Sequence, residues 1–151
     1  MGAWHARRLL IILLGVLLPL AACGSDGGIE VRGVWGRESP SMAQNSAFYM
    51  ELRNEGDGGD ALIGVQSEAC SRVELHESSM DDNGVMRMAP VPGGRIPLPA
   101  GAAVSLAPGG LHVMCLGVTE PFALGETIVL TLEFAEHEPL EVEAEIRRDA
   151  P

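Results

Sequence analysis

Two short stretches of this sequence carry side chains that could bind a soft metal ion. Read as a strand, residues 109–117 place His112 and Met114 on one face and the apolar Val113 and Cys115 on the other, because side chains alternate along a strand. Residues 72–77 repeat the pattern, with His76 on the face opposite its apolar neighbours. Imidazole and thioether groups away from the core are ligand types that suit soft metals.

A methionine-rich segment soon follows residues 72–77. The candidate ligands are His76, Met88, His112 and Met114. Met86 shares the strand face of Met88 and is its main rival, and Met80 could approach from an open loop. Two imidazoles with two thioethers form a neutral, soft ligand set that favours Cu(I). Thioethers also suit an oxidising compartment, because they form no disulfides.

Other chemistries find less support in the sequence. A serine hydrolase would need a nucleophile elbow, and zinc sites favour closely spaced Cys and His pairs; we find neither pattern. A blue-copper site would need Cys115 and His112 together, but they lie on opposite strand faces. We therefore predict a binding protein and not an enzyme. The alternatives are a copper oxidoreductase, and an interaction module in which the methionines fill the core and the histidines lie at the surface.

The first residues have the features of an export signal. Two arginines precede a short apolar run that ends in Leu20-Ala21-Ala22-Cys23, which is typical of a signal peptide rather than a spanning helix. The tetrapeptide resembles the lipobox of bacterial lipoproteins, which implies cleavage before Cys23 and a lipid on its sulfur. We expect a signal peptide over residues 1–22, a lipidated tether over 23–28, and an extracytoplasmic protein anchored to the bacterial cell membrane. An ordinary secretory signal with an incidental cysteine is the alternative.

The charge balance excludes nucleic acid as a partner. The chain has a formal net charge of −11, and loss of Arg7 and Arg8 with the leader would make it −13. All ten basic residues are arginines. Such a surface repels phosphates and gains nothing from anionic lipids, so membrane attachment must rest on the acyl chains.

If Cys23 is lipidated, Cys70 and Cys115 are left over in an oxidising compartment. We predict a disulfide between them, which would stabilise the fold by about 4 kcal/mol on the chain-entropy model. Strand parity supports this only in part. Cys115 falls on the core face, whereas Cys70 is out of phase with Val73 and Leu75 unless it precedes the strand proper.

The rest of the chain reads as short strands separated by Gly, Pro, Asn and Asp. We expect strands at 29–37, 46–53, 60–66, 71–77, 85–90, 102–106, 111–117, 127–134 and 140–147. Residues 96–99 contain two prolines and cannot form a central strand. We find no convincing helical period after the leader, so the fold class is all-β, an antiparallel β-sandwich.

The histidine and methionine pattern resembles the periplasmic copper chaperones of the PCuAC type. Their motif is a His, a Met and then a His-x-Met pair. Here His76 to Met88 look like its first half, and Gly109-Gly110-Leu111-His112-Val113-Met114 looks like its second. The spacings are slightly longer than in the family pattern, and the additional residues fall in turn regions, which tolerate insertion.

The resemblance implies a cupredoxin-like Greek-key sandwich over residues 29–149 that holds Cu(I) near its surface. It also implies delivery of copper to the CuA centre of cytochrome c oxidase subunit II, or exchange with another copper chaperone. From the residues themselves, Glu77 either orients the ring of His76 or is simply solvated.

Overall fold

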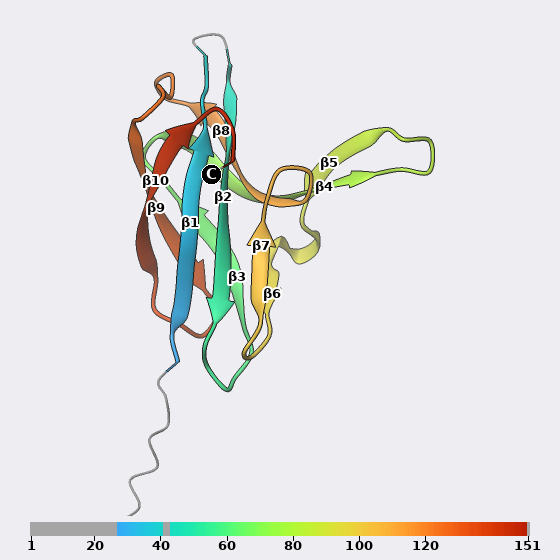
Figure 1. Cartoon of the computed structure of the whole chain (residues 1–151), viewed down its shortest axis with the longest axis vertical. Helices are drawn as coiled ribbons and strands as arrows, with labels where there is room; N and C mark the ends of the chain where they lie inside the picture. Colours follow the sequence, from blue (N-terminus) through green and yellow to red (C-terminus); the bar gives the residue numbers. More distant parts are fainter. Residues whose placement is uncertain (1–26, 41–42, 151) are drawn as a thin grey trace, which may run out of the picture.

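The computed structural model describes residues 27–40 and 43–150, which form an all-β domain (Figure 1). One three-residue 3₁₀ turn, η1 (Pro92–Gly94), follows the fifth strand. The strands are β1 (Ile29–Arg37), β2 (Asn45–Asn54), β3 (Asp60–Gln66), β4 (Cys70–Met80), β5 (Met86–Pro90), β6 (Ile96–Leu98), β7 (Ala103–Leu106), β8 (Leu111–Val118), β9 (Thr127–Phe134) and β10 (Leu140–Arg147).

The strands pair in the order β5-β4-β8-β2-β1-β10-β9-β3-β6, and β7 pairs with β2 beside this path. The sheet folds over a core of buried apolar side chains that come from nearly every strand. Strand β2 is central, because its first half pairs with β8 and its second half with β7. The predicted all-β sandwich is confirmed.

Strand β1 changes partners along its length. It runs antiparallel to β2, but Trp35–Arg37 also pair in parallel with β10. The register shifts between Arg32 and Trp35, where Gly33 adopts a left-handed φ of 57° that favours glycine. This bulge redirects the strand, so the predicted antiparallel sandwich contains one parallel pair.

The strand boundaries follow the alternation and the turn residues of the sequence. The predicted strands at 29–37, 60–66, 127–134 and 140–147 agree with the structure residue for residue. Pro97 lies in β6 at the sheet edge, where the missing N–H is tolerated. Strand β4 runs to Met80, beyond the predicted end at residue 77, because it continues into a hairpin with β5. Figure 1 shows this hairpin extending away from the body of the sandwich.

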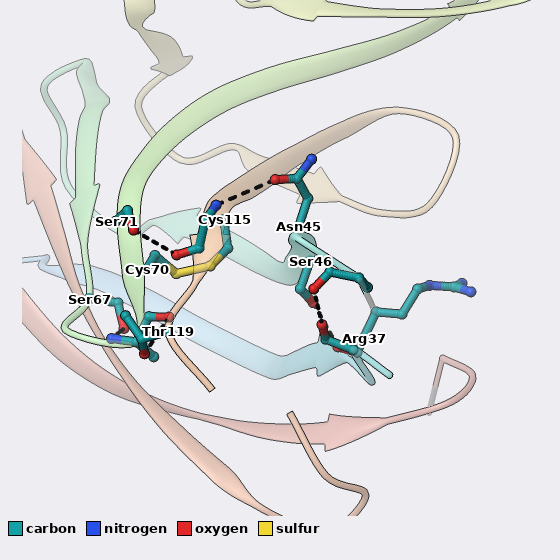
Figure 2. The surroundings of a disulfide bond; sticks show 12 residues. Arg37, Asn45, Ser46, Ser67, Cys70, Ser71, Cys115 and Thr119 are labelled. Atoms are coloured by element: carbon teal, nitrogen blue, oxygen red, sulfur yellow. Dashed lines mark hydrogen bonds between the residues drawn. A yellow bond between two sulfur atoms is a disulfide. The ribbon is translucent and has the colours of Figure 1, made fainter. Parts of the chain in front are cut away.

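A disulfide joins β4 to β8 (Figure 2). The Sγ atoms of Cys70 and Cys115 are 2.04 Å apart and their Cα atoms 5.5 Å apart. The β4–β8 ladder is interrupted next to the disulfide, where Ser71 and Gly117 do not form a ladder pair. Gly117 has a φ of 65° at this position. A Cβ on Gly117 would lie 2.7 Å from Ser71 Oγ, so glycine is required there. The interrupted alternation explains how Cys70 reaches the core in spite of its parity.

The predicted signal peptide and the lipidated Cys23 lie outside the described residues. The described ranges contain no helix that is long and apolar enough to cross a membrane.

Candidate metal centre

The two predicted histidine ligands face each other across neighbouring strands. His76 of β4 and His112 of β8 are directly opposed in the antiparallel ladder, so both side chains lie on the same face. Their ring centroids are 5.9 Å apart, with the rings inclined at 61°. The His112 residue is 3% exposed and the His76 side chain 12% exposed, so the pair is largely shielded from water.

Met114 lies on the same face of the sheet as both histidines. It is two residues beyond His112 in β8 and pairs with Glu74, as His112 pairs with His76. The opposite face carries the buried residues Val113 and Cys115. The expected division of β8 into a core face and a second face that carries His112 and Met114 is therefore observed, and Met114 is half-buried.

The hairpin register separates the two rival methionines of β5. Met88 is opposite Ser78, one cross-strand step from His76, whereas Met86 is opposite Met80 at the far end of the hairpin. All these residues share the face that carries His76, because paired positions in a ladder point to the same side. Side chains at diagonal positions lie roughly 7–8 Å apart at Cα, within reach of a methionine. Met88 is therefore nearer to the histidines in register than Met86.

Each histidine has one nitrogen engaged and one free. His76 Nε2 is 2.8 Å from Glu74 Oε2, and His112 Nδ1 is 2.9 Å from the Gly110 carbonyl oxygen, so each can donate its proton there. The other two nitrogens, His76 Nδ1 and His112 Nε2, are buried and have no hydrogen-bond partner. A buried polar atom left unpaired costs about 1–3 kcal/mol. If each ring donates its proton from the engaged nitrogen, these two nitrogens carry free lone pairs, which metal ligation requires.

Glu74, and not Glu77, is the carboxylate partner of His76. Residues 74 and 76 share a strand face, whereas Glu77 lies on the other face and is exposed. The hydrogen bond from His76 lowers the pKa of the Glu74 carboxyl below its ordinary value, and the nearby Arg72 lowers it further. The carboxylate is thus ionised at neutral pH and fixes both the tautomer and the orientation of His76. Of the two roles considered for Glu77, solvation is the one that the structure supports.

An aromatic row continues from the histidines into the sheet. Tyr49 of β2 lies beside His112, with ring centroids 6.3 Å apart, and Trp35 of β1 packs on Tyr49 at 4.6 Å. Both aromatic residues are buried and support the inner side of His112. Neither residue could be identified from the sequence, because only the cross-strand register brings Tyr49 next to His112 and Trp35 next to Tyr49.

His137 belongs to a different part of the molecule. Its Nδ1 is 2.9 Å from Asp60 Oδ2, which links the β9–β10 turn to the start of β3. Asp60 also accepts hydrogen bonds from the backbone N–H groups of Ala61, Glu136 and His137. This cluster is structural, in agreement with the omission of His137 from the candidate ligands.

The sulfur donors predicted for this site are thioethers. Within residues 27–40 and 43–150, no three His, Cys, Asp or Glu side chains come together in a way that could hold a metal ion. The two cysteines of this region are joined in the disulfide. The sulfur donor that shares the strand face of both histidines in β8 is the thioether of Met114, a donor type that suits a soft metal better than zinc or magnesium.

Comparisons with known proteins agree with this architecture. The family model described as "Putative lipoprotein LpqE-like" matches residues 29–146. The "Putative lipoprotein Lxx21020" of Leifsonia xyli subsp. xyli (strain CTCB07) is 31% identical over 137 residues, which cover 89% of this chain and 81% of that protein.

Solved structures of PCuAC domains have a similar fold. The apo PCuAC domain from PmoF1 has a TM-score of 0.68 and 26% identity, covering 83% of this chain and 96% of that domain. The copper-bound PCuAC domain from PmoF2 has a TM-score of 0.66 and 26% identity, covering 83% and 95%. The Cu(I) form of DR1885 from Deinococcus radiodurans has a TM-score of 0.56 and 27% identity, covering 84% of each chain. The chain therefore belongs to the LpqE-like lipoprotein family and has the cupredoxin-like fold of the PCuAC domains.

Proposed function

We propose that this chain is an extracytoplasmic, lipid-anchored copper chaperone that binds one Cu(I) ion through His76, Met88, His112 and Met114. The observation that carries the proposal is the pair of buried, unpartnered nitrogens on two imidazoles whose residues are directly opposed in the β4–β8 ladder. A metal about 2 Å from a ring nitrogen lies roughly 3 Å from the ring centre. The centroid separation of 5.9 Å is thus compatible with one ion shared by both rings.

The chemistry of the proposed donors supports Cu(I) as the oxidation state of the bound ion. Imidazole and thioether ligands are neutral, and the carboxylate of Glu74, beside His76, already accepts a hydrogen bond from it. Soft neutral ligands favour Cu(I), a d¹⁰ ion without strong geometric demands. The PmoF2 domain and DR1885 have been solved with copper bound, and DR1885 with Cu(I), which supports this assignment.

The site combines a buried inner side with an exposed outer side, as an exchangeable site needs. His112 rests on Tyr49, whereas Met88 is 60% exposed on the edge strand β5. A receiving protein could displace the Met88 thioether first, without unfolding the sandwich. Meanwhile the disulfide between β4 and β8 holds the two histidine strands in register.

Cu(I) titration against a competing chelator tests the binding site. His112→Ala should abolish competition, whereas His137→Gln, which alters a histidine outside the site, should leave it unchanged. Met88→Leu should weaken Cu(I) binding more than Met86→Leu, because both substitutions conserve volume and only Met88 is one step from His76. Unchanged affinity in His112→Ala would favour an interaction module without metal.

Delivery to the CuA centre of cytochrome c oxidase subunit II is the role that the family resemblance implies. The lipoprotein family and the lipobox-like tetrapeptide support action at the outer face of the cell membrane. Mixing the Cu(I)-loaded chain with the soluble domain of apo subunit II should transfer copper in a stoichiometric amount, read as metal content after separation. Retention of all copper by the donor would exclude this acceptor, but it would not contradict Cu(I) binding at the proposed site.

A further inference from the structure

The far end of the β4–β5 hairpin carries a second group of methionines. Met80 and Met86 are directly opposed in the ladder, immediately before and after the connecting turn. Opposed residues share a face, and their Cβ atoms lie about 4.5–5.5 Å apart. Two thioethers are thus held where one ion could contact both.

These two side chains have no packing role that would explain them. Met80 is 66% exposed and Met86 is 56% exposed, and β5 buries none of its five residues. Methionine is common in proteins as a filler of irregular core gaps, which exposure at this level rules out. Both side chains are instead exposed to solvent. The hairpin that carries them extends away from the body of the sandwich (Figure 1).

The turn between them is well defined. Asp81 Oδ1 accepts hydrogen bonds from the backbone N–H groups of Asn83 and Val85, each at 3.0 Å. Asp81 Oδ2 accepts from Arg87 Nε at 3.1 Å, and Gly84 provides the left-handed φ of 77° that closes the turn. These contacts keep Met80 and Met86 in register instead of leaving them on a loose loop.

The local charge favours a cation. Residues 77–88 contain the acids Glu77, Asp81 and Asp82 against the single base Arg87, a net charge of −2. Arg87 is opposed to Ser79, so it lies on the strand face away from the two methionines and is paired with Asp81. Within residues 77–88, a cation that approaches the thioethers therefore meets a segment of net negative charge, and the one base of that segment lies on the other face.

We propose that Met80 and Met86 form a second, weaker site for a soft monovalent cation such as Cu(I) or Ag(I). The site has no imidazole and is open to solvent, so it releases its ion more readily than the site at the histidines. Met88, a ligand of the site at the histidines, is two residues from Met86 on the same face of β5. An ion captured at the hairpin end is thus placed to pass inward, but the second site does not depend on metal binding at His76 and His112.

Titration of the full chain in detergent micelles with Ag(I), followed by NMR of ¹³C-labelled methionine methyl groups, tests the proposal. The Met88 and Met114 resonances should shift with the first equivalent, and those of Met80 and Met86 with the second. In the doubly substituted His76→Ala, His112→Ala chain, Met80 and Met86 should still shift. Met80→Leu combined with Met86→Leu should remove the second event and preserve the first.

Buried Met50 serves as the internal control, since its resonance reports an intact core in every variant. The proposal is overturned if the Met80 and Met86 resonances stay in place up to saturation while Met88 and Met114 shift. It is equally overturned if their response disappears in the double histidine variant while Met50 remains native. Failure of the first event alone would contradict the histidine site and not this one.

Discussion

Replacing His112 with leucine should separate the stability of the metal-free fold from metal binding. Leucine is apolar and similar in volume to histidine, so it can fill the buried space without a free nitrogen. His112 is 3% exposed and its Nε2 has no partner. Removing that unpaired atom should therefore stabilise the metal-free protein, while removing one imidazole ligand should abolish tight Cu(I) binding.

The size of the effect follows from the contacts. Eliminating a buried unpaired polar atom is worth about 1–3 kcal/mol, and loss of the Nδ1 hydrogen bond to Gly110 costs about 1 kcal/mol. The metal-free variant should thus be more stable by roughly 1 kcal/mol, which raises Tm by about 4 °C for a domain of this size. In the original chain, Cu(I) at one hundred times its Kd adds about 2.7 kcal/mol, or about 10 °C.

Thermal unfolding followed by Trp35 fluorescence, with and without Cu(I) under anaerobic conditions, measures both quantities. Without metal the His112→Leu chain should melt above the original chain, and with Cu(I) it should melt below it. The reasoning is refuted if the metal-free variant loses more than about 2 kcal/mol of stability, since His112 would then be a satisfied core residue. It is refuted as well if Cu(I) still raises the Tm of the variant by the same amount.

Three further outcomes are expected. Replacing Cys70 and Cys115 together with alanine should lower the free energy of unfolding by about 4 kcal/mol in denaturant titration, whereas an unchanged value would show that no disulfide forms in the native protein. Cys23→Ala should move the protein from the membrane fraction to the soluble fraction, and continued membrane association would contradict lipidation. Burial raises the pKa of Asp60, but hydrogen bonds from the Ala61 and Glu136 backbone and from His137 outweigh it, so the folded pKa lies below the ordinary value near 3.8. The stabilisation that ionised Asp60 contributes is therefore present above pH 4 and is lost as the pH falls through the folded pKa. Asp60→Asn should lower the free energy of unfolding by about 2 kcal/mol at pH 7 and make it depend less on pH below pH 4. The same dependence on pH in the variant and the original chain would contradict this.

Strand positions were predictable because alternation and turn residues agree with each other along the chain. Asn-Gly at residues 83–84 marks the turn of the β4–β5 hairpin, and Gly84 adopts the positive φ that this dipeptide suggests. The shared face of His112 and Met114 likewise follows from a period of two. These are local properties, and a local pattern is sufficient to identify them.

What could not be predicted depends on cross-strand register. Nothing in the spacing of His76 and His112 states that they oppose each other, or that Tyr49 lies beside His112. The carboxylate partner was in principle accessible, because Glu74 shares the face of His76 and Glu77 does not. The parity of Cys70 was unpredictable for another reason, since the irregular conformation of Gly117 interrupts the alternation.

X-ray absorption spectroscopy of the Cu(I)-loaded chain would identify the atoms that bind the copper ion. Both cysteines of the sandwich are in the disulfide, so any sulfur ligand that the sandwich supplies to copper must come from methionine. We predict two nitrogen and two sulfur ligands in the original chain, and two nitrogens with one sulfur in Met88→Leu. A shell without sulfur, or a sulfur count that neither Met88→Leu nor Met114→Leu reduces, would contradict the assignment of this site.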